Sequence, residues 1–220
     1  MIDWGYIVDA LPALIRGLGI TIMVSALAIA FSLLLGLAGC VLRLSAIPLA
    51  GRIVAGYVEF VRSTPFLVQV FFIFYGFPDL GMTLPVFWSG VLALTIWASV
   101  FHIESFRAGV TSAGRNMSDA SASLGLRSWQ HGLFIVMPIA LRSALPSTLN
   151  TIVGTIKNSA YLQAIGLAEM TYVAIGRVAS DFRTVEMFAT ICVIYVAIVL
   201  GVSALGHALE KRLDQPYRQR

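Results

Sequence analysis

The sequence predicts an all-α integral membrane protein with five transmembrane helices. The chain has 220 residues, of which 58% are hydrophobic and only 12% are charged, whereas soluble globular domains carry about 25% charged residues. Its mean hydropathy is +0.86, and the apolar residues form blocks long enough to cross a hydrocarbon layer of ~30 Å. These observations favour a membrane-spanning bundle over a large soluble core.

Five apolar stretches account for the predicted crossings. The first contains no charged residue, and the last is nearly as apolar. The fourth is the most polar, because Arg142, Lys157 and two prolines interrupt it. The predicted crossings are 18–42, 60–77, 85–103, 133–164 and 185–209.

Residues 1–17 are expected to form a separate external segment. Ile7, Leu11 and Leu14 fall on one helical face, which suits a short amphipathic helix lying at the membrane interface. The acidic start and Pro12 argue against a cleavable signal peptide.

The distribution of basic residues predicts the orientation. With an external N-terminus, nine basic residues become cytoplasmic and only Arg16, Arg177 and Arg183 remain outside, as the positive-inside rule requires. The nine are Arg43, Arg52, Arg107, Arg115, Arg127, Lys211, Arg212, Arg218 and Arg220. Residues 18–213 then form the transmembrane domain, with a cytoplasmic loop at about 108–132 and a cytoplasmic tail at 214–220. The net charge of +4 is small and scattered, so no nucleic-acid partner is expected.

The stretch "SDASASLGLRSWQHGLFIVMP" between the third and fourth crossings is unusually polar for this chain. Ser118 is suited to cap a short helix, and Asp119 in its first turn complements the helix dipole. Gly125 is suited to end that helix in the left-handed conformation, and Ser128 to cap a second helix. The sequence therefore predicts two short helices held against the cytoplasmic membrane face.

This stretch resembles the cytoplasmic signature loop of bacterial ATP-binding-cassette (ABC) importer permeases: Glu-Ala-Ala, three residues, Gly, nine residues, Ile-x-Leu-Pro. The corresponding residues are Asp119, Ala120 and Ser121, then Gly125, then Ile135-Val136-Met137-Pro138. Asp replaces Glu, Ser replaces the second Ala and Met replaces Leu. In the family the loop docks on the ATPase, so residues 108–132 are called the coupling segment below, with Asp119, Ala120, Ser121, Gly125 and Pro138 as its key positions.

Other segments are similar to the polar amino acid subfamily of these permeases. They are "YVEFVRSTPFLVQVFFIFYGFP", "IESFRAGV" and "TIKNSAYLQAIGLAEMT". The resemblance implies a five-helix type I (MetI-like) permease fold in the bacterial inner membrane. It also implies two permease subunits, copies or sister chains, together with two cytoplasmic ATPases and an extracytoplasmic binding protein.

The resemblance also implies transport of a polar amino acid, or a related zwitterion, by alternating access. The chain contains no G-x-x-x-x-G-K-[ST] phosphate-binding loop, so ATP and Mg²⁺ are expected on the partner ATPase and this subunit is not expected to be an enzyme. Both cysteines, Cys40 and Cys192, lie in apolar stretches, so neither a disulfide nor a metal site is expected. The alternative is half of a nucleotide-independent channel or secondary carrier.

Two Glu-x-x-Arg pairs, Glu59 with Arg62 and Glu104 with Arg107, are expected near the cytoplasmic ends of their helices. Three-residue spacing places each pair on one helical face. One interpretation is simple neutralisation at the membrane edge; the other is an inner gate that exchanges partners during transport.

The fourth crossing carries a small and polar stripe at helical spacing, which predicts either a helix-packing surface or a transport pathway. Lys157 and the adjacent Asn158 favour a pathway, since packing needs no ammonium group, and Lys157 would attract a substrate carboxylate. Gln69 in the second crossing is a further pathway candidate, although a lone Gln more often joins helices. The predicted pathway residues are Asn150, Gly154, Lys157, Asn158, Tyr161 and Gln69.

Two further groups have simpler interpretations. The first crossing carries an uncharged stripe of small residues, which predicts close helix packing: Thr21, Ser25, Ala28, Ser32, Gly36 and Gly39. Glu169, Asp181 and Glu186 fall in or beside the last external loop. They are expected either to receive the binding protein or to be solvated.

Overall fold

The computed structural model describes residues 2–214, with side chains except those of residues 114–116, 118–120, 122, 128, 213 and 214. Every regular element in this part of the chain is helical. The α-helices are α1 (Trp4–Leu44), α2 (Pro48–Ser63), α3 (Phe66–Phe71), α4 (Val86–Ser123), α5 (Ser128–His131), α6 (Met137–Asn158), α7 (Met170–Asp181) and α8 (Thr184–Asp214). Shorter π or 3-10 turns are η1 (Phe72–Gly76), η2 (Pro78–Leu80), η3 (Gly132–Val136) and η4 (Ser159–Ile165).

The described part of the chain contains four helices long and apolar enough to cross a membrane: Trp4–Leu44, Val86–Ala113, Trp129–Ile165 and Thr184–Arg212. A fifth candidate span is the bent pair Pro48–Ser63 and Phe66–Gly76. The all-α membrane architecture predicted from the sequence is therefore confirmed, with one of its five crossings bent.

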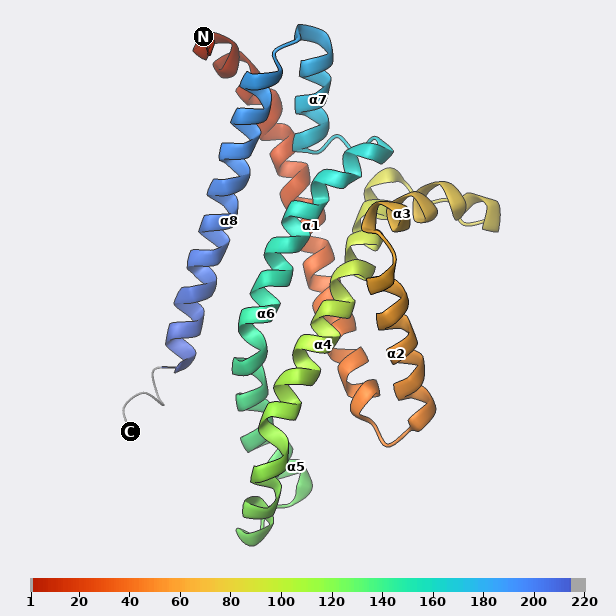
Figure 1. The fold of residues 1–220 in the computed structure, drawn as a ribbon, viewed down its shortest axis with the longest axis vertical. Coiled ribbons are helices and arrows are strands. Elements are labelled where there is room, and N and C mark those ends of the chain that lie inside the picture. The colour runs from red at the N-terminus through yellow and green to blue at the C-terminus, as the bar shows by residue number, and fades with distance from the viewer. Residues whose placement is uncertain (1, 215–220) are drawn as a thin grey trace.

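Helices α1 and α4 pack along much of their length and form the centre of the bundle (Figure 1). The predicted packing role of the small residues in the first crossing is confirmed, because all six are buried. At Gly36 a Cβ atom would lie 2.5 Å from Cβ of His102 on α4, so only glycine permits this approach. The core of the chain is thus a contact between two helix backbones.

The expected separate helix over residues 1–17 is absent from the described structure, because α1 continues without a break from Trp4 through Gly17 into the first crossing. At 1.5 Å per residue α1 is about 60 Å long, roughly twice the thickness of a hydrocarbon core. Asp3 caps it by accepting a hydrogen bond from the Tyr6 backbone N–H at 3.1 Å. Pro12 is accommodated inside the helix.

The prediction of one straight helix over 60–77 is wrong. Pro65 has no N–H and disfavours the helical conformation in the residue before it, and Thr64 is accordingly extended, with φ −107° and ψ 138°. The chain turns by 106° between α2 and the α3–η1 segment. The crossing begins with Pro48 at the first position of α2, where a missing N–H costs nothing.

The third crossing is longer than predicted. Helix α4 continues past residue 103 to Ser123, so no helix begins at Ser118, and the expected cap there is wrong. The predicted left-handed residue is confirmed: Gly125 has φ +72°, and the Leu126 N–H donates to the Ser121 carbonyl at 3.1 Å, which is the Schellman arrangement. Helix α5 begins at Ser128, whose side chain lies outside the described residues.

The fourth crossing is a stack of helical segments from α5 through η4. Pro138 lacks an N–H, and immediately before it the Met137 N–H bonds back five residues to the Gly132 carbonyl, widening the helix at η3. The coupling segment therefore passes into the membrane-spanning helix without an intervening loop.

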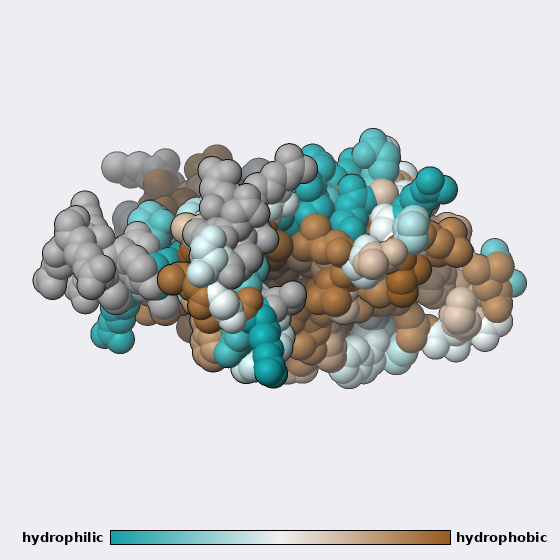
Figure 2. Space-filling model, turned by 90° about the horizontal axis from the view of Figure 1, so that it is seen from below, coloured by the Kyte–Doolittle hydropathy of each residue, from teal (hydrophilic) through white to brown (hydrophobic). Residues whose placement is uncertain are grey.

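The basic residues concentrate at one end of the bundle. This end carries the α1–α2 turn, the α4–α5 turn and the end of α8 (Figure 1). Arg43 lies in the last turn of α1, and Lys211 and Arg212 lie in the last turn of α8. Seen from this end, hydrophilic clusters alternate with apolar surface (Figure 2). The start of α1, helix α7 and the α7–α8 turn lie at the opposite end (Figure 1). We call these the basic end and the α7 end.

Candidate functional site

The coupling segment lies at the basic end, where α4 and α5 extend beyond the α1–α2 turn (Figure 1). Large apolar side chains are exposed on it: Met117 is 43% exposed, Leu124 77% and Trp129 58%. The Asp119 and Ala120 side chains lie outside the described residues, although both backbones belong to α4. Exposed apolar side chains at the tip of a helical turn suit contact with another protein.

Ser121 is buried on the inner side of this turn and joins its two helices. Its hydroxyl lies 2.5 Å from the Met117 carbonyl and 2.8 Å from Nδ1 of His131. The hydroxyl has one hydrogen, and the carbonyl can only accept, so Nδ1 of His131 donates to Ser121. The sequence signal for this bond was available: Ser stands where the family pattern has Ala, ten residues before a histidine.

Helix α5 has its own cap. The Gln130 side chain accepts a hydrogen bond from the Arg127 N–H at 2.8 Å, which satisfies a donor at the start of the helix. Gly125 shapes the turn before it, and half-buried Pro138 follows it at the start of α6. Among its described side chains, the coupling segment is thus held by hydrogen bonds on its inner side and exposes Met117, Leu124 and Trp129.

The predicted pathway stripe on α6 faces outward between α4 and α8. Asn150, Lys157 and Tyr161 are exposed, while α6 buries the opposite side through Thr148, Thr151 and Thr155. Packing within this chain reaches only part of the stripe: a Cβ at Gly154 would meet the Trp97 ring at 3.0 Å, and Tyr161 contacts Phe66 edge-on at 6.0 Å. Asn158 is half-buried. A polar helix face left open in a membrane bundle suits an aqueous path or a second subunit.

Lys157 borders a groove of about 450 Å³ between α6 and α8. Thr171 and Tyr195 contribute hydroxyl groups to its lining, and the remaining lining residues are mostly apolar. The lysine is therefore one cation beside neutral polar groups, an arrangement that can attract a carboxylate.

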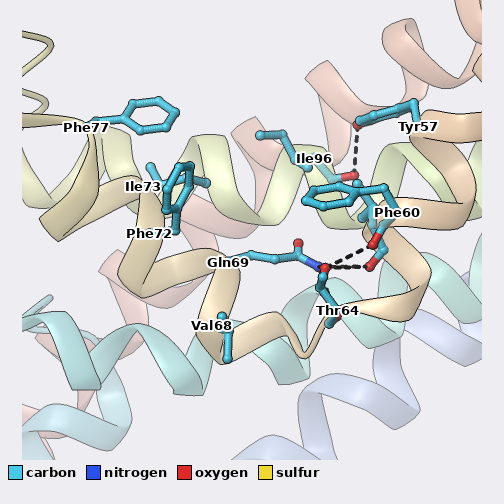
Figure 3. Close-up of a pocket in the computed structure, with 10 residues that line it drawn as sticks. Tyr57, Phe60, Thr64, Val68, Gln69, Phe72, Ile73, Phe77 and Ile96 are labelled. Carbon is cyan, nitrogen blue, oxygen red and sulfur yellow. Dashed lines mark hydrogen bonds between the residues drawn. The ribbon is translucent and has the colours of Figure 1, made fainter. Parts of the chain in front are cut away.

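Gln69 lies on α3, and its side chain reaches back to the end of α2 beside a cavity of about 380 Å³ (Figure 3). Its side-chain NH₂ lies 2.8 Å from the Val61 carbonyl and 2.8 Å from the Thr64 hydroxyl. Its carbonyl oxygen is buried and has no hydrogen-bond partner among the described residues. These bonds hold the bend at Pro65, which is the helix-joining alternative that the sequence left open.

The two Glu-x-x-Arg pairs behave differently. Arg107 donates to Glu104 from Nη2 at 2.7 Å and from Nε at 3.0 Å, and Arg43 of α1 approaches the same carboxylate at 3.9 Å. Among the described ion pairs none joins Glu59 to Arg62; the Arg62 guanidinium instead lies 5.8 Å from the Phe101 ring centroid.

The two pairs were expected at the same end of the bundle, but Glu59 and Arg62 lie away from the basic end, where α2 begins. They lie near the end of α2 that meets α3, because α2 already begins at Pro48. Of the two glutamates, Glu104 is the one that forms described ion pairs, with Arg43 and Arg107.

Glu169 is fully buried, which corrects the expectation that it is solvated or meets the binding protein. It caps α7 by accepting the Tyr172 N–H at 2.7 Å, and its other oxygen accepts from Tyr195 at 3.2 Å and Thr21 at 3.4 Å. Burial raises the pKa of this carboxyl, although these hydrogen bonds oppose the shift. Glu169 thus joins α1, α7 and α8. Glu is not among the preferred N-cap residues, so no local sequence signal predicted this role.

The other two acids at the α7 end also have partners within the chain. Glu186 is buried and lies 3.3 Å from Arg183. Asp181 accepts from the Tyr6 hydroxyl at 2.8 Å and lies 3.6 Å from Arg177. The Tyr6–Asp181 bond and an ion pair between Arg183 and Asp3 at 3.5 Å join the start of α1 to the α7–α8 turn.

The membrane bundle, the projecting apolar-tipped turn at its basic end and the open polar helix face define a membrane subunit that acts with partners. The chain belongs to the family described as the binding-protein-dependent transport system inner membrane component, whose model matches residues 36–215. The predicted permease family and its helical fold are therefore confirmed.

Similar proteins extend over nearly the whole chain. A probable amino-acid ABC transporter permease protein, PatM of Vibrio harveyi, is 30% identical, with 98% of each chain covered. The glutamine transport system permease protein GlnP of Escherichia coli (strain K12) is 31% identical, with 96% of this chain and 97% of that protein covered.

A solved structure described as an amino acid ABC transporter with histidines has a TM-score of 0.90 and 31% identity. The match covers 96% of this chain and 99% of that one. None of these three proteins supports the alternative of a nucleotide-independent channel or carrier.

Proposed function

We propose that this chain is the permease subunit of an ABC importer that takes up a polar amino acid or a related small zwitterion. The observation that carries the proposal is the coupling segment, an apolar-tipped turn at the basic end of a membrane bundle. The amino-acid substrate is supported by the two permeases and the transporter structure that resemble the chain over nearly its whole length.

The assembly follows from the surfaces that this chain leaves open. A second permease, a copy or a sister chain, would cover the open face of α6 and complete the pathway. Two ATPase subunits, carrying ATP and Mg²⁺, would receive the coupling segments. A substrate-binding protein would dock at the α7 end, and lipid would cover the apolar outer surface.

The orientation in this proposal places the basic end in the cytoplasm and the start of α1 outside. The positive-inside rule supports it, because Arg43, Lys211 and Arg212 all lie at the basic end. The protein is then a multi-pass protein of the bacterial inner membrane, with its C-terminus in the cytoplasm.

Transport would proceed by alternating access. Closure of the ATPases on ATP draws the two coupling segments together. This movement tilts α4 and α6, because no loop separates either helix from the coupling segment. Since the ATPases can shift this equilibrium only by contacting the two states differently, the exposed tip must change its contacts during the cycle.

Within the membrane, different polar side chains would have different roles in transport. Lys157 would attract the substrate carboxylate, while Asn158, Asn150 and Tyr161 would offer hydrogen bonds along the open face of α6. Glu104 with Arg107 would brace the inner gate, and Glu59 and Arg62 would line its upper part at the α2–α3 bend.

The test is to purify the chain from its native membrane and to reconstitute it with the ATPase and binding protein that accompany it. ATP-dependent uptake of labelled glutamine is expected. Ala120→Asp should release the ATPase and abolish uptake, because it places a charge in the docking turn, while Thr83→Asp, in the exposed η2–α4 connection, should not.

Two results would overturn parts of this proposal. Normal uptake by the Ala120→Asp complex would exclude the docking role of the coupling segment. Uptake by the purified chain alone, in vesicles without nucleotide, would exclude the importer mechanism altogether.

A further inference from the structure

A cleft of about 260 Å³ lies between α6 and α8, and its lining is mixed in polarity. From α6 it is lined by Pro146, Leu149, Asn150 and Val153, and from α8 by Val202, Ser203, His207 and Glu210. Asn150 belongs to the predicted pathway stripe; the polar residues of α8 were not predicted. Their signal was the spacing of four and three residues from Ser203 to Glu210, which places them on one helical face.

A close contact between the two helices borders the cleft. A Cβ at Gly206 would lie 2.6 Å from Cδ1 of Leu149, so glycine allows α8 to approach α6 at this level. Next to this contact, the larger side chains of Asn150 and His207 line the cleft and are not packed in the core. The cleft is thus part of how these two helices pack.

The hydrogen-bonding state of His207 follows from its partner. Nδ1 lies 2.8 Å from the Ser203 carbonyl oxygen, which can only accept, so Nδ1 carries a hydrogen. In the neutral imidazole the other ring nitrogen, Nε2, then has its lone pair available. In this tautomer His207 therefore offers an acceptor at Nε2.

The other polar groups add to this excess of acceptors. Glu210 contributes two carboxylate oxygens and makes no ion pair with any described residue. Asn150 contributes an amide oxygen. The lining of the cleft includes one acid, Glu210, and neither Lys nor Arg. A site of this composition, rich in acceptors, favours a cation that only donates hydrogen bonds.

We propose that this cleft binds a primary alkylammonium group, with Glu210 supplying the opposite charge and His207 and Asn150 the further acceptors. An ammonium group has three donors and no acceptor, which matches these three residues. The group comes either from the transported amino acid as it leaves towards the cytoplasm or from the headgroup of an aminophospholipid. The first source rests on the proposed function; the second does not.

The test uses the intact transporter complex in lipid nanodiscs, with Val202→Cys in the cleft as a reporter. Maleimide modification of residue 202 is followed by mass spectrometry of chymotryptic peptides. Cleavage after Tyr195 separates residue 202 from the exposed Cys192, so neither native cysteine needs to be replaced. Ethylammonium should slow the modification, whereas tetramethylammonium, which has no donors, should not. Glu210→Gln should raise the half-protecting ethylammonium concentration by about tenfold, because a hydrogen bond to a charged group is lost.

Two comparisons identify the source. In discs of phosphatidylcholine, protection by glutamine but not by glutaramate, which lacks the α-ammonium group, assigns the site to the substrate. In discs of phosphatidylethanolamine, protection without any added amine assigns it to the lipid headgroup. Asp79→Asn, an exposed acid on η2 outside the cleft, is the matched control and should leave every rate unchanged.

Equal modification rates with and without ethylammonium, or protection that survives Glu210→Gln, would overturn the inference. If Val202→Cys prevents assembly, Val153→Cys reports from the α6 side of the same cleft. Failure of ATP-dependent uptake for every member of a panel of labelled polar amino acids, with protection by ethylammonium intact, would instead refute the proposed function and leave the ammonium site standing.

Discussion

The Ser121 hydroxyl and Nδ1 of His131 lie 2.8 Å apart across the turn that joins α4 to α5. The bond fixes the angle at which the exposed apolar tip leaves the bundle. Since η3 follows His131 directly, this angle is also the angle at which the coupling segment enters the membrane-spanning helix. A movement of the tip is therefore passed to α6 as long as the bond is intact.

Ser121→Ala should weaken the transmission of movement from the exposed tip to α6 without unfolding the protein. It removes a hydrogen bond worth about 1 kcal/mol and leaves Nδ1 of half-buried His131 without its acceptor. We expect transport per ATP hydrolysed to fall by up to about fivefold, since 1 kcal/mol corresponds to a factor of about five. Uptake and ATPase activity are measured on the same reconstituted complex.

The matched control is Thr111→Ala. Its hydroxyl bonds only the Arg107 carbonyl in its own helix, so its loss should not change coupling. Equal coupling ratios for Ser121→Ala and wild type would show that the bond transmits nothing. In a double-mutant cycle, His131→Ala should add little to Ser121→Ala.

Gly36→Ala should destabilise the protein strongly for its size. The added methyl group would lie 2.5 Å from Cβ of His102 and 3.3 Å from the Phe106 ring, so α1 and α4 must separate. Overpacking of this kind costs about 1–3 kcal/mol. The measurement is the thermal unfolding midpoint in detergent, which should fall.

Gly19→Ala on the same helix is its control, because an added Cβ there meets nothing within 4 Å. That variant should be neutral or stabilised by up to about 1 kcal/mol, since alanine favours the helix. Identical midpoints for the two variants would mean that the α1–α4 approach is not tight.

The long apolar crossings could be predicted from composition, because hydropathy and helical spacing are local properties of the sequence. The small-residue stripe of α1 was predicted for the same reason, since Gly36 and Gly39 share a face at helical spacing. The bend at Pro65 was missed because the apolar run continues through it, although proline chemistry predicts a break. Hydropathy indicates which residues lie in the membrane, but it does not specify the direction of the helices that they form.

The partners of polar side chains were harder to predict. Three-residue spacing permits an ion pair but does not require one: Glu104 pairs with Arg107, while Arg62 lies against Phe101. Glu169 was expected to be solvated or to meet the binding protein, yet it is buried and accepts a hydrogen bond from Thr21, 148 positions earlier. Such contacts depend on tertiary packing, which local spacing does not specify.

Glu104→Gln should be more harmful than Arg107→Gln. Glu104 lies between two guanidinium groups, so its loss leaves Arg43 and Arg107 facing each other, whereas loss of Arg107 leaves Glu104 beside Arg43. Removing one member of a paired cluster exposes an uncompensated charge. The yield of assembled complex and the uptake rate should both follow the order wild type, Arg107→Gln, Glu104→Gln.

The double variant separates charge from shape. Glu104→Gln with Arg107→Gln removes one positive and one negative charge, so it should recover part of what Glu104→Gln loses. If the double variant is no better than Glu104→Gln alone, the carboxylate acts through something other than neutralising its neighbours.

Glu169 should make stability depend on pH. Burial raises the pKa of its carboxyl above the ordinary value of 4.5, so the folded protein keeps this proton to higher pH than the unfolded chain does. The stabilisation from this group is therefore complete below the unfolded pKa and is lost as the pH rises through the folded pKa. Glu169→Gln stays neutral throughout, and the Thr21 and Tyr195 hydroxyls can turn to accept from its amide.

The unfolding midpoints of wild type and Glu169→Gln are compared in detergent from about pH 4 to about pH 8, a range that includes the ordinary carboxyl pKa. A constant shift of the midpoint caused by the amide does not depend on pH, so the informative quantity is the change with pH in the difference between the two proteins. That difference should move in favour of Glu169→Gln as the pH rises, whereas Asp79→Asn, at an exposed position, should follow wild type. Parallel curves for wild type and Glu169→Gln would mean that the carboxyl is no harder to ionise in the folded protein than in the unfolded chain, and that its network with Thr21 and Tyr195 compensates fully for its burial.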